Sequence, residues 1–271
     1  MDSKNTYLKI LASEDTYRTP AAMHKKFILK PKWYFFRKFI GIILESGYNA
    51  KRDNYNEVDW ANTSYEMLQA LEESGVIFSI TGMHHLTATD SPVVFIGNHM
   101  STLETVVLPS IIQPVKRTTF VVKAELMEFP VFRHVLATRG PVVVGRNNPR
   151  EDLKIVLREG QQKLHSGTSI IIFPQRTRSV QFDPDLFNSL GVKLAQRSEV
   201  PVIPLALCTD AWENGRLIKE YGKINTQKTV RIAFDHPMEV TGNGTDVHQH
   251  VLDFIRDKLK EWGRTDCLVT K

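Results

Sequence analysis

The chain has 271 residues, and 42% of them are hydrophobic, which is enough apolar material for one large domain or two small ones. Charged residues of both signs are mixed along the chain, which argues against bulk disorder. The formal net charge of +5 favours anionic partners. Because the basic residues are not concentrated in one aromatic-laced stretch, we expect no nucleic-acid binding.

The first 22 residues are polar and predict a loosely ordered lead, without the apolar core of a secretory signal. A helix is predicted next, at about residues 32–47. One arc of this helix carries Arg37, Lys38, Gly41 and Glu45. Outside that arc lie Trp33, Phe36, Phe39, Ile40, Ile43 and Leu44. The pattern is typical of a helix lying in a bilayer interface, and equally of a helix packed on its own domain.

Strand and helix patterns alternate from about residue 64, after a polar stretch at 53–63 that we interpret as a linker. Strands are predicted at Val76–Ile80, Val93–Gly97, Thr118–Val122, Pro141–Val144, Ile170–Phe173, Val202–Leu205 and Val230–Phe234. Helices are predicted at 64–73, 102–112, 128–137, 150–166, 186–198 and 246–262. This alternation indicates an α/β fold with a largely parallel central sheet flanked by helices.

These patterns divide the chain into two parts. Residues 1–62 form an N-terminal segment with the amphipathic helix, and residues 63–271 form the α/β domain. No run of about 18 apolar residues occurs in either part, so we expect no conventional membrane span.

The segment GNHMSTLETV, residues 97–106, begins at the end of a predicted strand, where α/β sheets place their sites. Within one regular helix His99 and Glu104 would lie about 140° apart, so they meet only if His99 precedes the helix. Ser101 and Glu104 have the spacing of a capping box, which starts the helix between them and makes Glu104 structural. A histidine base oriented by an acid makes Glu104 functional. The two interpretations are compatible, because a cap also fixes the direction of the carboxylate.

Two further segments place arginine at strand ends. Arg146 follows the run PVVVG, and the buried strand at 170–173 continues into Gln175, Arg176, Thr177 and Arg178. Such a turn suits an anionic head group, which guanidinium groups bind bidentately. The alternative is a basic turn at the surface.

In this order and spacing, the segments above and VPVIP at 200–204 resemble the glycerolipid acyltransferase family, typified by 1-acylglycerol-3-phosphate acyltransferase. That family carries Asn-His-x4-Asp, an arginine-ending strand, Phe-Pro-Glu-Gly-Thr-Arg-Ser and Val-Pro-x-x-Pro. The resemblance covers about residues 75–210. It implies an O-acyltransferase of phospholipid biosynthesis, held as a peripheral or monotopic protein at the cytoplasmic face of a membrane.

The resemblance also implies a mechanism and site residues. His99 would take the proton of the free hydroxyl of a lysophospholipid-like acceptor, and Glu104 would orient His99. The acyl group would come from a thioester of coenzyme A or acyl carrier protein, with no metal and no other cofactor. The acceptor's phosphate would be held by Arg146, Gln175, Arg176, Thr177 and Arg178.

Three residues depart from the family pattern. Glu104 replaces Asp, Gln175 replaces Glu, and Arg176 replaces Gly. Glutamate occurs at the first of these places in the related lipid A late acyltransferases. The other two changes make the turn more positive, so we hypothesise that the chemistry is kept while the acceptor differs from plain lysophosphatidate.

Two other interpretations remain open. A non-catalytic membrane-surface protein that binds anionic lipids would also explain the basic turn and the amphipathic helix. The pairs His84-His85 and His248-Gln249-His250 suggest metal, but they have no carboxylate or cysteine partner at ligand spacing. We interpret them as surface histidines.

Overall fold

The computed structural model describes residues 15–21, 31–129, 133–145, 147–175, 177–215 and 221–269. Within these residues, one 8-stranded sheet forms the centre of the fold, in the order β1-β2-β8-β7-β3-β6-β4-β5. The strands are β1 (Thr16–Arg18), β2 (Phe78–Thr81), β3 (Val94–Gly97), β4 (Thr118–Lys123), β5 (Val142–Val144), β6 (Ser169–Ile172), β7 (Val202–Cys208) and β8 (Val230–Phe234). Neighbours are parallel except at β1–β2 and β7–β8.

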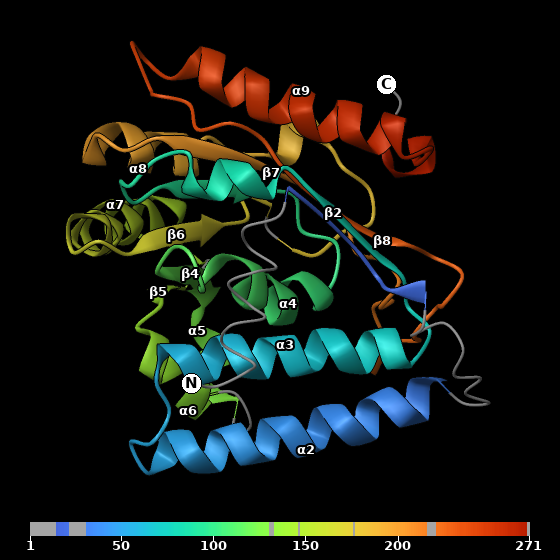
Figure 1. The fold of residues 1–271 in the computed structure, drawn as a ribbon. Coiled ribbons are helices and arrows are strands. Elements are labelled where there is room, and N and C mark those ends of the chain that lie inside the picture. The colour runs from blue at the N-terminus through green and yellow to red at the C-terminus, as the bar shows by residue number, and fades with distance from the viewer. Residues whose placement is uncertain are drawn as a thin grey trace.

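Helices cover both faces of the sheet (Figure 1). One face carries α2 (Pro31–Lys51), α3 (Glu57–Glu73), α4 (Leu103–Ile112), α5 (Ala124–Glu128) and α6 (Arg133–Arg139). The other face carries α7 (Pro149–His165), α8 (Leu190–Ser198) and α9 (Thr245–Glu261). Short 3₁₀ turns, η2 (Met83–Thr87), η3 (Pro184–Leu186) and η5 (Thr265–Cys267), join the elements. In Figure 1, α4 lies between the sheet and α3, and α2 lies outermost, beyond α3.

The central strand β3 shows why the sheet is sandwiched. Val94, Phe95 and Ile96 are all fully or nearly fully buried, as expected for a parallel strand covered on both faces. Phe95 belongs to the apolar core under α3 and α4, whereas Val94 and Ile96 belong to the core under α7, α8 and α9. The predicted α/β architecture with a largely parallel sheet is therefore confirmed.

The predicted linker at 53–63 is wrong, because α3 already begins at Glu57. The side chain of Asn56 accepts hydrogen bonds from the backbone of the first turn, and the carboxylate of Asp59 accepts one from the backbone N–H of Asn56. This capping box starts the helix within a polar stretch. The domain boundary placed after residue 62 consequently falls inside α3.

Two other elements differ from the sequence prediction. Residues 16–18, assigned to a polar lead, form the edge strand β1, which pairs with β2. The helix predicted at 128–137 is divided into α5 and α6, with residues 130–132 outside the described chain.

The predicted amphipathic helix is α2, and its apolar residues are divided between two directions. Phe35, Phe36 and Phe39 are buried and contact Trp212 through edge-on rings. Trp33 and Leu44 remain 72% and 61% exposed, and Ile40 and Tyr48 are exposed with them. Packing on the domain is therefore confirmed for one side, while a second apolar side lies open to solvent.

Among the described residues, no helix combines the length and apolar character that crossing a membrane requires.

Candidate active site

The end of β3 is fixed against β7, and this sets the direction of the chain as it reaches His99. The Asn98 side chain donates to the Leu207 carbonyl and accepts from the Leu207 N–H, each at 2.8 Å. A Cβ on Gly97 would lie 2.9 Å from the carbonyl oxygen of Leu205, so glycine permits this close approach. Asn98 thus continues the strand pairing with its side chain.

His99 is held through both its ring and its backbone. Its Nδ1 lies 2.8 Å from Oε1 of Glu104, and its ring stacks on Phe173 with 4.5 Å between centroids and 5° between planes. Its backbone carbonyl accepts from the N–H of Ser179 at 2.9 Å. Because the carboxylate can only accept, Nδ1 carries the hydrogen and Nε2 is the nitrogen able to accept a proton.

The carboxylate of Glu104 is fully buried and accepts hydrogen bonds at both of its oxygens. Its Oε1 accepts from His99 and from the backbone N–H groups of Met100 and Ser101, at 2.7 and 2.9 Å. Its Oε2 accepts from the hydroxyls of Ser101 and Thr209, at 3.0 and 2.6 Å. Burial raises the pKa of Glu104, but the hydrogen bond and charge of His99, with the bonds from Thr209 and Ser101, outweigh burial and lower the pKa. Glu104 is therefore ionised at neutral pH.

The predicted capping box forms only in part. Helix α4 begins at Leu103, and the backbone N–H of Ser101 donates to Glu104 as expected. The hydroxyl of Ser101, however, accepts from the N–H of Leu103 at 3.1 Å. The same carboxylate thus supports the start of the helix and holds His99, as the sequence had left open.

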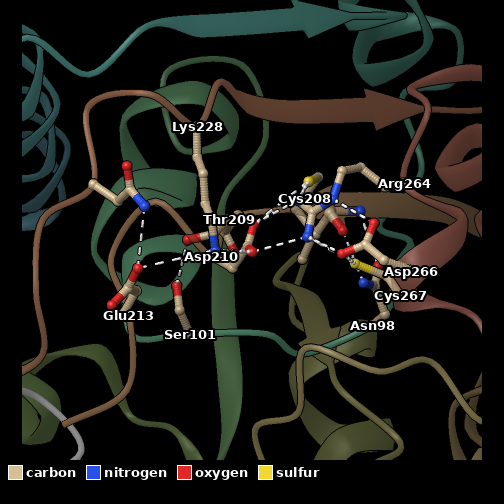
Figure 2. A network of polar contacts seen from close by, with 12 residues as sticks. Asn98, Ser101, Cys208, Thr209, Asp210, Glu213, Lys228, Arg264, Asp266 and Cys267 are labelled. Carbon is tan, nitrogen blue, oxygen red and sulfur yellow. Dashed lines mark hydrogen bonds and ion pairs between the residues drawn. The ribbon is translucent and has the colours of Figure 1, made fainter.

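An ion-pair network around the next residue, Asp210, holds the backbone at Thr209 in place (Figure 2). Asp210 pairs with Arg264 through two contacts at 2.7 and 2.9 Å, and with Lys228 at 2.7 Å. Burial raises the pKa of Asp210, but the hydrogen bonds from Arg264 and Lys228 outweigh it and lower the pKa to about 2. Residues after α9 and before β8 therefore fix the turn from which Thr209 reaches Glu104.

We expect Thr209→Val to lower kcat about tenfold and to leave KM for both substrates unchanged. The change keeps the shape of the side chain and removes one donor to a buried carboxylate, a bond of about 1.5–3 kcal/mol. Steady-state kinetics measure the split, and Thr209→Ser, which keeps the hydroxyl, should restore activity. A Val variant as active as the wild type would show that the bond does not support the reaction.

The predicted anion-binding turn lies beside His99. Gln175 is buried, and its Oε1 accepts from the backbone N–H of His99 at 2.6 Å, so only its amide nitrogen remains for a phosphate. Thr177 is exposed, and Arg178 is half-buried with its guanidinium on the hydroxyl of Thr102. Arg146 and Arg176 lie outside the described residues.

A cavity of about 620 Å³ opens beside His99. His99, Thr102, Thr177 and Arg178 contribute polar groups to its wall. The rest of the wall comes from α2, α3, α4, β4, α5 and α6 and is mostly apolar, with Ile43, Trp60, Val106, Phe120 and Leu136 among its side chains. The volume lies in the range of small-molecule sites. Polar groups at one part of the wall and mostly apolar side chains elsewhere suit a ligand with an anionic end and an alkyl chain.

Sequence reasoning missed three residues of this site. Phe173 was assigned only to a strand, although it carries the ring under His99. Asn98 had no assigned role, and Thr209 was outside the candidate set. The signal available for Thr209 was a hydroxyl directly after a buried strand.

Comparisons with known proteins show which enzymes this chain is similar to. A family model described as acyltransferase matches residues 77–208. The chain is 27% identical over 192 residues to a 1-acyl-sn-glycerol-3-phosphate acyltransferase of Pseudomonas aeruginosa, covering 69% of this chain and 71% of the relative. It is 30% identical over 128 residues to a chloroplastic enzyme of that name from Brassica napus, covering 47% of this chain and only 36% of the relative.

The fold also has a solved counterpart. The crystal structure of the 1-acyl-sn-glycerophosphate acyltransferase from Thermotoga maritima superposes with a TM-score of 0.64 at 17% identity. The superposition covers 89% of this chain and 97% of that one, so the two share the fold.

Proposed function

Because the chain belongs to the glycerolipid acyltransferase family, as an enzyme of the 1-acylglycerol-3-phosphate acyltransferase type, we propose that it moves a fatty acyl group from a thioester to the free hydroxyl of a phosphate-bearing lysolipid. The contact between Nδ1 of His99 and the buried carboxylate of Glu104, 2.8 Å, carries this proposal. The activity named for these relatives supports lysophosphatidate as the first acceptor to test.

In the proposed reaction, Nε2 of His99 takes the proton of the acceptor hydroxyl as its oxygen attacks the thioester carbon. The negative charge of Glu104 stabilises the imidazolium that forms. When the tetrahedral intermediate collapses, the carbon–sulfur bond breaks, and the thiolate leaves with the proton held on Nε2. The products are the diacyl lipid and free thiol of coenzyme A or acyl carrier protein, and the scheme uses no metal and no covalent enzyme intermediate.

Arg178 and Thr177 are our candidates for the acceptor phosphate, because both line the cavity that His99 faces. Gln175 in place of the family's Glu does not by itself imply a different lipid substrate. Its carbonyl oxygen accepts a hydrogen bond from the backbone N–H of His99, as a carboxylate oxygen can. The hypothesis of an acceptor other than plain lysophosphatidate therefore rests on Arg176. Arg146 and Arg176 both stay proposed ligands of the phosphate.

A panel of acceptors tests the proposed head-group recognition. We expect lysophosphatidate and other phosphate-bearing lysolipids to react at least tenfold better in kcat/KM than monoacylglycerol, which lacks the phosphate. Removal of one charge-assisted contact by Arg178→Ala should raise KM for the phosphate-bearing acceptors about tenfold, and barely affect monoacylglycerol. Clear preference for lysophosphatidate would reject the hypothesis of another acceptor, and equal rates with monoacylglycerol would reject phosphate recognition.

The open apolar side of α2 supports a second part of the proposal, attachment to the membrane surface, whose cytoplasmic face stays a prediction. We expect the double change Trp33→Ser and Leu44→Ser to weaken binding to anionic vesicles at least tenfold, because burying such side chains contributes about 1.5–3 kcal/mol each. Vesicle sedimentation measures this. Leu186→Ser, which removes an exposed apolar side chain from η3, is the matched control. Equal binding of all three proteins would place the membrane contact elsewhere.

The alternative, a non-catalytic protein that binds anionic lipids, accounts for the open side of α2. It gives no reason for a buried, ionised carboxylate held against a histidine at the wall of an apolar cavity. Vesicle binding without thioester turnover would favour this alternative.

A further inference from the structure

Histidines gather at a second place, away from the cavity. Asp235 and His236 directly follow β8, His250 lies on α9, and His84 and His85 lie in η2. These make up four of the nine histidines of the chain. None of these residues lines the cavity beside His99.

One carboxylate stands at the centre of this cluster. Oδ1 of Asp235 lies 2.9 Å from Nδ1 of His236, and Oδ2 lies 2.7 Å from Nε2 of His250. One ligand atom from each of the three residues lies within 4.8 Å of the others. The ring of His85 follows at 6.3 Å from the ring of His236, centroid to centroid.

This arrangement supplies what the sequence lacked. The histidine pairs had no carboxylate at ligand spacing along the chain, whereas the fold brings Asp235, 15 residues away, onto His250. We propose that Asp235, His236 and His250 form a binding site for a divalent transition metal of the zinc class. His85 is the nearest candidate for a fourth ligand.

The chemistry of the donors selects the metal. Zinc takes imidazole nitrogen at about 2.0–2.1 Å and carboxylate oxygen at about 2.0–2.2 Å, so two ligand atoms on one ion lie up to roughly 4.2 Å apart. Donors already within 4.8 Å therefore reach one ion with small side-chain movements. Two imidazoles and one carboxylate suit zinc, nickel or copper, whereas magnesium and calcium take mostly oxygen ligands.

The site would join elements that are distant in the chain. Asp235 and His236 extend β8, and His250 belongs to the helix that covers the sheet on the side away from α2. Because the unfolded chain does not hold these donors together, binding stabilises the folded state. The metal is thus structural and takes no part in the acyl transfer proposed above.

Zinc itself is the probe. The full chain, freed of metal with a chelator and kept in detergent near neutral pH, is titrated with zinc against a chromophoric competitor, and Tm is measured with and without zinc. We expect one equivalent to bind with a Kd of about 10 μM or tighter and to raise Tm. X-ray absorption should show nitrogen and oxygen ligands.

Two variants locate the site. His250→Gln keeps a donor to Asp235, so the fold should persist, while zinc affinity falls at least tenfold and the rise in Tm disappears. Asp235→Asn keeps the side-chain shape, and we expect the same loss of zinc affinity and of the rise in Tm. His165→Gln, an exposed histidine at the end of α7, should bind zinc as the wild type does. Absence of binding at about 1 mM zinc, sulfur ligands, or unchanged affinity in either cluster variant would overturn the proposal.

Discussion

His99→Ala is expected to lower acceptor-dependent acyl transfer about a thousandfold or more. The change removes the only group in the described part of the site that joins a buried carboxylate to the wall of the cavity. General-base catalysis alone contributes about a hundredfold to ten-thousandfold, and alanine also removes the group that returns the proton to the leaving thiolate. Thiol release from an acyl thioester in the presence of lysolipid measures the loss.

The variant must be shown to fold. Alanine removes the stacking on Phe173 and one donor to the buried carboxylate of Glu104, so we expect the free energy of unfolding to fall by about 2–4 kcal/mol, with near-native circular dichroism. His165→Ala, at an exposed histidine on α7, should retain full activity. If His99→Ala kept more than about a tenth of the rate, the proton would be taken by another group.

Glu104→Gln is expected to lower kcat about a hundredfold or more with little change in fold. Oε1 accepts only from N–H groups, and Oε2 meets only the hydroxyls of Ser101 and Thr209. A glutamine can therefore place its oxygen at the first position and its NH₂ at the second, because hydroxyls also accept. The substitution removes the charge that stabilises the imidazolium and keeps the contacts of the helix start.

The stability that this variant loses depends on pH in a definite direction. Because the pKa of Glu104 lies below its usual value of 4.5, ionisation stabilises the folded protein at pH values above 4.5. That contribution is lost as the pH falls through the lowered pKa. The difference in unfolding free energy between wild type and Glu104→Gln should thus be largest at neutral pH and shrink in acid, as denaturant titrations can show.

Glu104→Asp supplies the control that restores the residue usual in the family. The shorter side chain keeps the charge but cannot reach all of the donors around Glu104, so we expect activity between those of Gln and wild type. If Glu104→Gln were nearly as active as the wild type, the carboxylate would serve only the start of α4.

The strands were predictable where burial on both faces leaves an uninterrupted apolar run. Val230–Phe234 has the predicted bounds, β3 begins one residue later than predicted, and β6 is shifted by one residue at both ends. Strand β1 was not predictable, because its three residues become a strand only by pairing with the edge of β2. The start of α3 was missed because a capping box in a polar stretch resembles a linker until the buried side of the helix is known.

In the site, too, a contact within one segment was predictable, whereas contacts between distant segments were not. His99 and Glu104 could be paired from the sequence, because a strand end and a helix start within one segment determine how they meet. Phe173 and Thr209 follow two other strands, and they reach this pair only because β3 lies between β6 and β7. That strand order is a property of the whole sheet and leaves no trace in the spacing of any one motif.

The most direct test of the proposed acyl transfer is thiol release from palmitoyl-coenzyme A by the purified chain in detergent, with and without lysophosphatidate. We expect release that depends on the acceptor, yields the diacyl product in equal amount, and vanishes in His99→Ala. If the coenzyme A thioester is inert, palmitoyl-acyl carrier protein is tried in the same way. Absence of acceptor-dependent release with both donors and every lysolipid of the panel would contradict the proposed function.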